Sequence, residues 1–223
     1  MQNILKIIIN YTNRYFLLYI CISMNKAESK ADRTKQYIVE KTAPVFNTKG
    51  YAGTSINDLM NATGLSKGSI YGNFENKDEV ALAAFDYNFG KVVSYIRKKV
   101  EARVTYIDKL LVYPETYRNL FSLPFLEAGC PLLNTSAEAD DTHPMLREKA
   151  LKALRLWKTS VELLIKKGIE KQEINPCTNA AEFAAILMSL VEGAVMQAKL
   201  TGQLTELNFS MNFLERMIKD LKV

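Results

Sequence analysis

Apolar residues recur along most of this chain at spacings of three and four, which is the period of an amphipathic α-helix. Runs that alternate apolar and polar residues between hairpin turns are not found in the sequence. The pattern therefore predicts an all-α protein, with about nine or ten helices separated by Gly, Pro and Asn punctuation.

The first predicted helix runs from about Ala27 to Thr48 and stops at Gly50. Its inner apolar stripe, at i, i+4 and i+8, consists of Ile38, Thr42 and Phe46. Pro44 lacks the N–H that would bond one turn back, so we expect this helix to be kinked or shorter.

Two short helices and a long one are predicted next. Ser55-x-x-Asp58 has the form of a capping box and starts a helix that ends near Gly64. Ser66 is the expected cap of a third helix of about two turns, and a fourth runs from Lys77 toward Arg103. The apolar residues that can close one small core around the turn at Gly64 are Ile56, Leu59, Met60, Leu65, Ile70 and Phe74.

The rest of the chain is predicted to be helical with short breaks. The expected segments are residues 106–112, 115–128, 131–139, 144–168, 178–201 and 205–221. Pro114, Gly129-Cys130-Pro131 and Asn175-Pro176 are among the breaks, and Thr142 to Pro144 can start a helix.

Composition and charge narrow the function. The chain is 48% hydrophobic and 24% charged, which is enough for a folded core. Its net charge of +5 is mild, but residues 24–77 have an excess of basic groups, whereas residues 78–223 are balanced. A basic head on a neutral body is typical of a DNA-binding protein.

Candidate catalytic and metal-binding chemistry is sparse. Cys21, Cys130 and Cys177 form no CxxC pair and favour a reducing cytoplasm. His143, the only histidine, precedes Pro144, and we expect it to have a surface or capping role. With no phosphate loop or nucleophile elbow, the sequence predicts neither an enzyme nor a metal site nor a cofactor site.

The first 23 residues are apolar in patches that are broken by Lys6, Arg14 and several Asn residues. The longest clean run, Tyr15–Ile22, is far shorter than the roughly 20 residues that cross a bilayer. The order of charge and apolar residues is also poor for a signal peptide. We hypothesise that translation starts at Met24 and that residues 1–23 are an untranslated leader; no membrane partner is expected.

The stretch from Gly50 to Lys77 resembles the DNA-binding head of the TetR family of transcriptional regulators. The shared pattern is a Gly-aromatic start, a Thr-Ser cap, an apolar pair, an Ala-x-Gly turn, a Ser-Lys-Gly-Ser start, then Tyr, Phe and Lys in register. Here it consists of Gly50-Tyr51, Thr54-Ser55, Leu59-Met60, Ala62-Thr63-Gly64, Ser66-Lys67-Gly68-Ser69, Tyr71, Phe74 and Lys77. The close resemblance covers about residues 30–90.

The resemblance implies a three-helix, helix-turn-helix DNA-binding domain over residues 24–77 and a ligand-binding and dimerisation domain over 78–223. In such a motif the second helix lies in the major groove with its first residues at the base edges. We therefore expect Lys67 to read guanine and Asn73 to read adenine. Ser55, Tyr71 and Lys77 are expected to bind phosphates, while Gly68 and Ser69 allow close approach. Gly72-Asn73 departs from the bulkier residues usual in the family, so relatives' operator contacts do not transfer there.

The body is expected to hold the dimer interface and an effector. By resemblance, residues 178–201 and 205–221 form a four-helix bundle with their twins, with Gly193 and Ala194 permitting close approach. The candidate effector-binding residues are Tyr95, Phe121, Phe125, Cys130, Trp157 and Phe183, with Leu126 beside them. The same aromatic spacing is also typical of a plain core, and a buried, inert Cys130 is favoured over a redox sensor.

The expected function is a cytoplasmic, homodimeric regulator, a repressor released from a palindromic operator by a small molecule. Three alternatives remain open at this point. One is a small-molecule-binding protein whose head has no specific site, the second is an enzyme on a helical scaffold, and the third is a regulator tethered to a membrane by residues 1–23.

Overall fold

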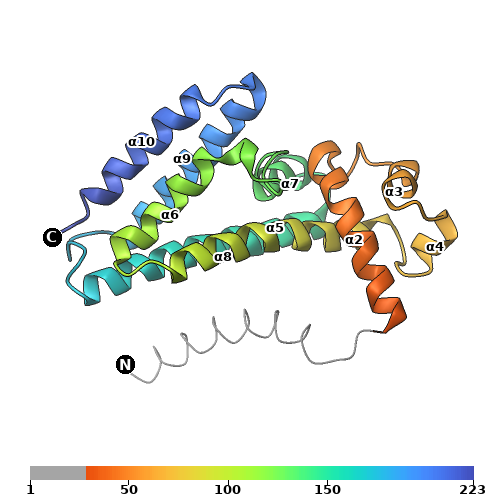
Figure 1. Cartoon of the computed structure of the whole chain (residues 1–223), viewed down its shortest axis with the longest axis horizontal. Helices are drawn as coiled ribbons and strands as arrows, with labels where there is room; N and C mark the ends of the chain where they lie inside the picture. Colours follow the sequence, from red (N-terminus) through yellow and green to blue (C-terminus); the bar gives the residue numbers. More distant parts are fainter. Residues whose placement is uncertain (1–28) are drawn as a thin grey trace. The chain divides into compact units, whose positions relative to one another are not determined.

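The computed structural model describes residues 29–223, and nine α-helices and one 3₁₀ helix, η1, make up most of that range (Figure 1). The same residues contain no β-strand, only an isolated bridge between Ile174 and Lys222. The all-α prediction is confirmed. The elements are α2 (Lys30–Lys49), α3 (Ile56–Thr63), α4 (Lys67–Tyr71), α5 (Lys77–Glu101), α6 (Tyr106–Arg118), η1 (Leu120–Ser122), α7 (Pro131–Ala139), α8 (Pro144–Glu170), α9 (Ala180–Thr201) and α10 (Thr205–Lys219).

Residues Tyr37–Val223 form one compact unit, and residues 29–36, the first turns of α2, lie outside it. The start of α2 is capped locally, because the Asp32 N–H donates to the Ser29 hydroxyl at 3.1 Å. The predicted leader (residues 1–23), the start at Met24 and the helix start at Ala27 lie outside the described residues.

A small core joins the first helices of the larger unit. Leu59, Ile70 and Phe74 are buried as predicted, while the predicted Ile56, Met60 and Leu65 are half-buried at its edge. The stripe of α2 is also buried at Ile38, Thr42 and Phe46. We call α2, α3, α4 and the start of α5 the head.

The predicted break at Pro114 is wrong, and Pro44 does not shorten the first helix. α2 continues through Pro44 to Lys49, and α6 continues through Pro114 to Arg118. A proline inside a helix removes one backbone bond, but Ala43 and Phe46 on α2, and Tyr113 and Tyr117 on α6, are buried around it. Burial of these neighbours outweighs the lost bond.

The predicted helix over residues 115–128 is largely wrong. After Arg118 the chain forms η1 and then turns up to Gly129, whose φ of +92° suits only glycine readily. Pro124 and Gly129 prevent a continuous helix there, although the apolar Leu120 and Leu126 remain fully buried.

The remaining helices form the body around a second, larger core. α10 packs against α6 and α9, and α8 packs against α7 and α9. α5 belongs to both cores, because Val80 and Ala84 lie in the head core while Phe85 and Val92 lie in the body core. This shared helix connects the head mechanically to the body.

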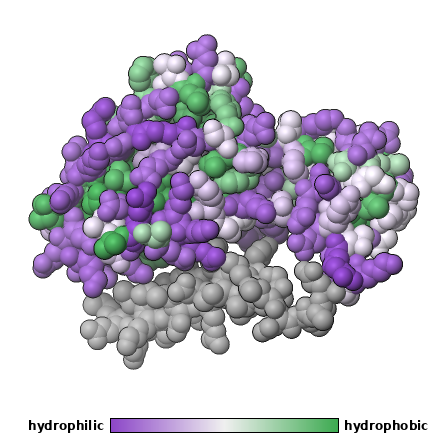
Figure 2. Space-filling model, in the orientation of Figure 1, coloured by the Kyte–Doolittle hydropathy of each residue, from purple (hydrophilic) through white to green (hydrophobic). Residues whose placement is uncertain are grey.

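α9 is the one described helix that is long and apolar enough by composition to cross a membrane. In the most apolar stretch of α9, 44% of the residues are buried inside the protein. There α9 packs against α8 and α10. The core helix of a folded domain also meets this criterion of length and apolar composition. On the face drawn in Figure 2, hydrophobic side chains gather in patches among hydrophilic ones.

Candidate DNA-binding and effector sites

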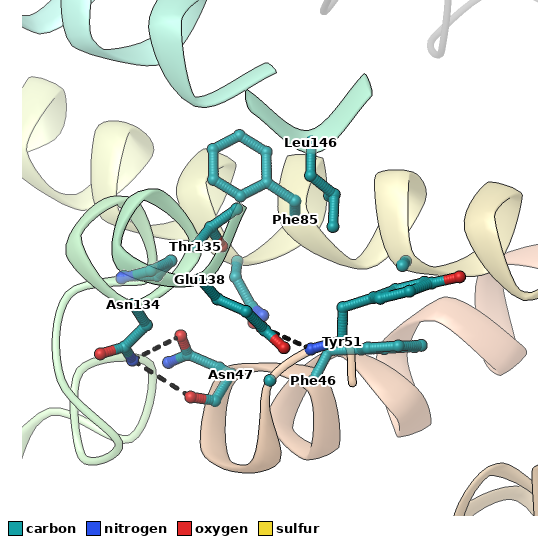
Figure 3. Close-up of a pocket in the computed structure, with 12 residues that line it drawn as sticks. Phe46, Asn47, Tyr51, Phe85, Asn134, Thr135, Glu138 and Leu146 are labelled. Atoms are coloured by element: carbon teal, nitrogen blue, oxygen red, sulfur yellow. Dashed lines mark hydrogen bonds between the residues drawn. The ribbon is translucent and has the colours of Figure 1, made fainter. Parts of the chain in front are cut away.

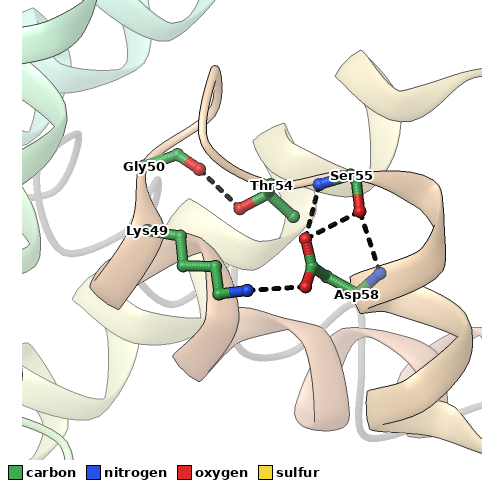
Figure 4. A network of polar contacts seen from close by, with 5 residues as sticks. All are labelled: Lys49, Gly50, Thr54, Ser55 and Asp58. Carbon is green, nitrogen blue, oxygen red and sulfur yellow. Dashed lines mark hydrogen bonds and ion pairs between the residues drawn. The ribbon is translucent and has the colours of Figure 1, made fainter.

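The turn into α3 is held by a network of polar contacts (Figure 4). Gly50 has φ +72°, and the Thr54 hydroxyl donates to its carbonyl at 2.5 Å. Ser55 caps α3: Asp58 N–H donates to the Ser55 hydroxyl at 3.2 Å, and Ser55 N–H donates to the Asp58 carboxylate at 2.8 Å. The predicted capping box is confirmed.

Lys49 completes this network from the last turn of α2. Its ammonium donates to the Asp58 carboxylate at 2.6 Å. This contact, followed by the bonds from Ser55, holds the pKa of Asp58 well below its ordinary range. Asp58 is therefore ionised at neutral pH, and Lys49 offsets a negative charge that would otherwise repel a nearby phosphate. The sequence interpretation missed Lys49, whose only local signal is a basic residue at a helix end.

The helix-turn-helix turn forms at Gly64, which adopts φ +69° and closes α3 with a bond from its N–H to the Met60 carbonyl. Ser66 then caps α4, accepting the N–H of Ser69 at 3.2 Å. α4 spans only five residues, so it is shorter than the predicted two turns, and Gly72 is its C-cap rather than an interior residue.

The predicted DNA-contacting residues fall into two groups. Ser55, Lys67 and Gly68 are exposed, with the latter two at the start of α4. Ser69, Tyr71, Asn73 and Lys77 are half-buried. The buried Ile70 anchors α4 from the opposite side, so the polar start of α4 faces solvent and is available to a groove.

Several of these side chains already have partners within the head. The Asn73 amide donates to the Ser69 carbonyl at 2.9 Å, which leaves its oxygen and second N–H for a base. The Ser55 hydroxyl donates to Asp58 at 2.8 Å. The Lys77 ammonium lies 4.2 Å from the centre of the Tyr51 ring.

Tyr51 is the centre of a cluster that joins the head to α8. Its hydroxyl donates to Asp78, and this bond, together with burial, raises the pKa of Tyr51 to about 12. The His143 ring lies edge-on, with ring centroids 4.4 Å apart. His143 accepts the Leu146 N–H through Nδ1 at 3.3 Å, so its predicted capping role is confirmed; it is buried rather than on the surface.

The candidate effector residues do not form one group. Tyr95 and Phe125 lie together, with ring centroids 5.1 Å apart, and both are half-buried. Trp157 stacks near Tyr113 and Tyr117, at 6.4 Å and 6.0 Å between centroids. Phe183, Cys130 and Leu126 are buried in the body core, whereas Phe121 is exposed.

A partly buried polar contact inside the body was not anticipated. The Cys130 thiol donates to Oε1 of Glu192 on α9 at 3.0 Å. Burial raises the pKa of Glu192 to about 7, and burial and then Glu192 raise the pKa of Cys130 well above its ordinary value. The thiol stays protonated, which fits the predicted inert cysteine. Glu192 was missed because nothing local marks a glutamate in an apolar helix as buried.

Four buried side-chain atoms of the described residues have no hydrogen-bond partner: Oγ1 of Thr116, the indole N–H of Trp157, Oε2 of Glu192 and Oε2 of Glu206. Trp157 and Glu192 share Tyr117 as a neighbour, Trp157 through ring stacking and Glu192 through its charge. Buried polar atoms are normally satisfied, so these two are available to a bound molecule. The described residues contain no cluster of three or more His, Cys, Asp or Glu side chains that could hold a metal ion.

Comparison with known proteins assigns both parts of the chain. Residues 38–84 match the family model described as "Bacterial regulatory proteins, tetR family", and residues 107–214 match "Tetracyclin repressor-like, C-terminal domain". A TetR-family regulator structure from Cytophaga hutchinsonii is 48% identical with a TM-score of 0.82, covering 89% of this chain and 99% of that one.

A second TetR regulator structure, from Chloroflexus aurantiacus, is 37% identical with a TM-score of 0.82, covering 86% of this chain and 98% of that one. The transcriptional repressor DhaR from Mycobacterium sp. is 26% identical over 170 residues, 74% of this chain and 82% of its own length. These relatives are DNA-binding regulators and not enzymes. This chain therefore belongs to the TetR family of helix-turn-helix transcriptional regulators.

Proposed function

We propose that this protein is a cytoplasmic homodimeric repressor that binds a near-palindromic operator through α4 and is released by a small-molecule effector. The observation that supports it most is the start of α4, where Lys67 and Gly68 are exposed while Ile70 and Phe74 close the head core behind them. Repression of transcription, as opposed to activation, is supported by relatives such as the repressor DhaR. In this proposal residues 24–77 bind DNA, and residues 78–223 bind the effector and the second subunit.

We assign base reading to Lys67 and Asn73. A lysine at the first position of α4 can donate to guanine, and the free oxygen and second N–H of Asn73 can pair with adenine. Gly68 and Ser69 leave room for the backbone to approach the groove. Ser55, Tyr71 and Lys77 would bind phosphates, and Lys77 would have to leave the Tyr51 ring to do so.

The dimer is proposed to form through α9 and α10. One face of each helix is buried within the chain, but each keeps an exposed apolar stripe: Ile186, Met196 and Leu200 on α9, and Phe209 and Phe213 on α10. A side chain at Gly193 would meet no atom within 4 Å, so a partner helix can approach there. Ala194 is only 2% exposed and faces the core, so its predicted part in that approach is wrong.

The effector is proposed to bind in the body beside Trp157 and Glu192. The unpartnered indole N–H calls for an acceptor on the ligand. The unpartnered Glu192 oxygen calls for a donor when the carboxyl is ionised and for an acceptor when it is protonated. Phe183 and Cys130 belong to the body core, and Phe125 packs against that core with Tyr95 beside it. The exposed Phe121 is the weakest of the candidates. A compound that releases the wild-type protein from DNA should release Trp157→Phe less effectively.

Footprinting on the DNA upstream of the protein's own gene tests the proposal. We expect two protected half-sites whose centres are about one helical turn, or roughly 34–36 Å, apart. Equal affinity for this DNA and for a random duplex at moderate salt would contradict a specific operator there. That result would instead favour a ligand-binding protein whose head has no specific site.

A further inference from the structure

We infer that Glu138, a residue of the body, positions the DNA-binding head by clamping the turn that leads into α3. Glu138 lies in the last turn of α7 (Figure 3). Its two carboxylate oxygens accept two successive backbone N–H groups, that of Tyr51 at 2.6 Å and that of Ala52 at 2.7 Å. Short hydrogen bonds to a charged carboxylate are stronger than those between neutral groups. Two of them to one carboxylate fix the orientation of the turn as well as its distance from α7.

The clamp also explains why the residue before Tyr51 is a glycine. A Cβ on Gly50 would overlap the Glu138 carboxylate, and Gly50 adopts φ +72°, which L side chains rarely do. The backbone therefore approaches the carboxylate as closely as it does only because no side chain intervenes.

A second contact on the same helix supports the clamp one turn earlier. The Asn134 amide donates to the backbone carbonyl of Asn47 at 3.1 Å and to its side-chain oxygen at 3.0 Å. Asn47 in turn donates to the Gly129 carbonyl at 3.3 Å. The small pocket between these residues, of about 30 Å³, has room for a water or two, not for an effector. The interface is therefore a joint and not a ligand site.

α7 connects this joint to the body core. Cys130, the residue before α7, donates a hydrogen bond to Glu192 on α9. Lys199, also on α9, donates to the Asn134 side chain at 2.8 Å. A ligand at Glu192, as proposed above, would therefore act on the start of the helix whose end carries the clamp. This last step rests on the proposed effector site; the clamp itself does not.

The consequence for DNA binding concerns specific sites alone. A palindromic operator requires both heads at one spacing and one orientation, whereas a random duplex is bound mainly through charge. If Glu138 holds the head in the orientation that fits the operator, a loosened head must be ordered when it binds there. The lost conformational entropy weakens specific binding and has little effect on non-specific binding.

Glu138→Gln tests the inference in the full-length dimer, because glutamine offers one acceptor where two N–H groups need two. Asp141→Asn is the matched control: it removes the same charge from an exposed residue three positions further on. The probes are the duplex protected in the footprint and a random duplex of equal length. For Glu138→Gln we expect about tenfold weaker binding to the protected duplex, unchanged binding to the random one, and an unchanged salt dependence. The control should match the wild type.

Hydrogen exchange separates positioning from loss of structure. Protection should fall at the Tyr51 and Ala52 amides in Glu138→Gln and remain at the amides of α3 and α4. Unchanged affinity for the protected duplex overturns the inference, and so does equal weakening on both duplexes or loss of protection throughout the head. A wild-type protein that does not distinguish the duplexes refutes the specific operator instead, which is a separate result.

Discussion

Lys67 is exposed at the first position of a helix anchored by the buried Ile70, and this position favours its proposed role in reading a base. Within residues 29–223, no hydrogen bond or ion pair of the Lys67 side chain competes with DNA. Asn73 and Ser55, in contrast, already bond within the head. We therefore expect Lys67 to contribute more to specific binding than either of these.

Replacing Lys67 by alanine should weaken operator binding by roughly 10- to 100-fold, since one good base contact is worth about 1–3 kcal/mol. A gel retardation titration measures this, with helicity from circular dichroism and mass from sedimentation expected to stay unchanged. The control is Lys152→Ala, which removes the same charge from an exposed position on α8. Normal operator binding by Lys67→Ala would show that α4 is not the reading helix.

Glu192 should make the stability of the protein depend on pH. Burial raises its folded-state pKa from 4.5 to about 7, so the folded state holds a proton that the unfolded state has lost. The free energy of unfolding should therefore fall as the pH rises from about 4.5 to about 7, by up to roughly 3 kcal/mol per site.

Chemical denaturation at several pH values measures this slope. The protein concentration is held fixed because the stability of a protein that dimerises, as proposed above, depends on concentration. Glutamine has nearly the same shape as glutamate but cannot ionise. In Glu192→Gln the free energy of unfolding should therefore change little over this pH range. An equal slope in wild type and variant would mean that Glu192 is not the group responsible.

At the scale of the elements, α3 and α4 are too short to be stable alone, and their ends decide whether they form. Each begins with a serine cap, and α3 ends with Gly64 in the left-handed conformation. Gly90, in the middle of α5, has a helical environment instead, and a Cβ there would meet nothing within 4 Å.

The same substitution should therefore have opposite effects at these two glycines. Gly64→Ala has room for the methyl group but forces alanine to φ +69°, which should destabilise the protein by about 1 kcal/mol. Gly90→Ala should stabilise it by about 0.5–1 kcal/mol, because alanine favours the helix interior. Thermal unfolding at equal protein concentration compares the two, and a shift of the same sign in both would contradict the structural assignment of these helix positions.

At the scale of the whole molecule, the exposed apolar stripes of α9 and α10 are the surface that we assign to the partner subunit. Phe213 is 45% exposed on α10, with Arg216 5.7 Å from its ring centre. Leu154 on α8 is exposed to nearly the same degree, 43%, but lies outside the proposed interface. Substitutions at Phe213 and Leu154 therefore distinguish the loss of a dimer contact from the loss of an exposed hydrophobic side chain in general.

Phe213→Glu should shift the protein to monomers, since it places a charge in an apolar interface, and operator affinity should fall with the dimer. Leu154→Glu, the matched control, should leave the mass unchanged. Sedimentation equilibrium measures both. If Phe213→Glu stays dimeric at micromolar concentration, the subunits must associate through other surfaces.

The sequence by itself determined the all-α fold, the helix-turn-helix and its caps. Ser55, Gly64 and Ser66 act through bonds to residues within four positions, and the apolar period depends only on neighbouring turns, so local pattern was sufficient. Only the tertiary structure decided that α6 continues through Pro114, that Cys130 meets Glu192, and that Glu138 clamps Tyr51. The latter two contacts join residues 62 and 87 positions apart, and such pairs form because packed helices bring them together, which no local pattern reveals.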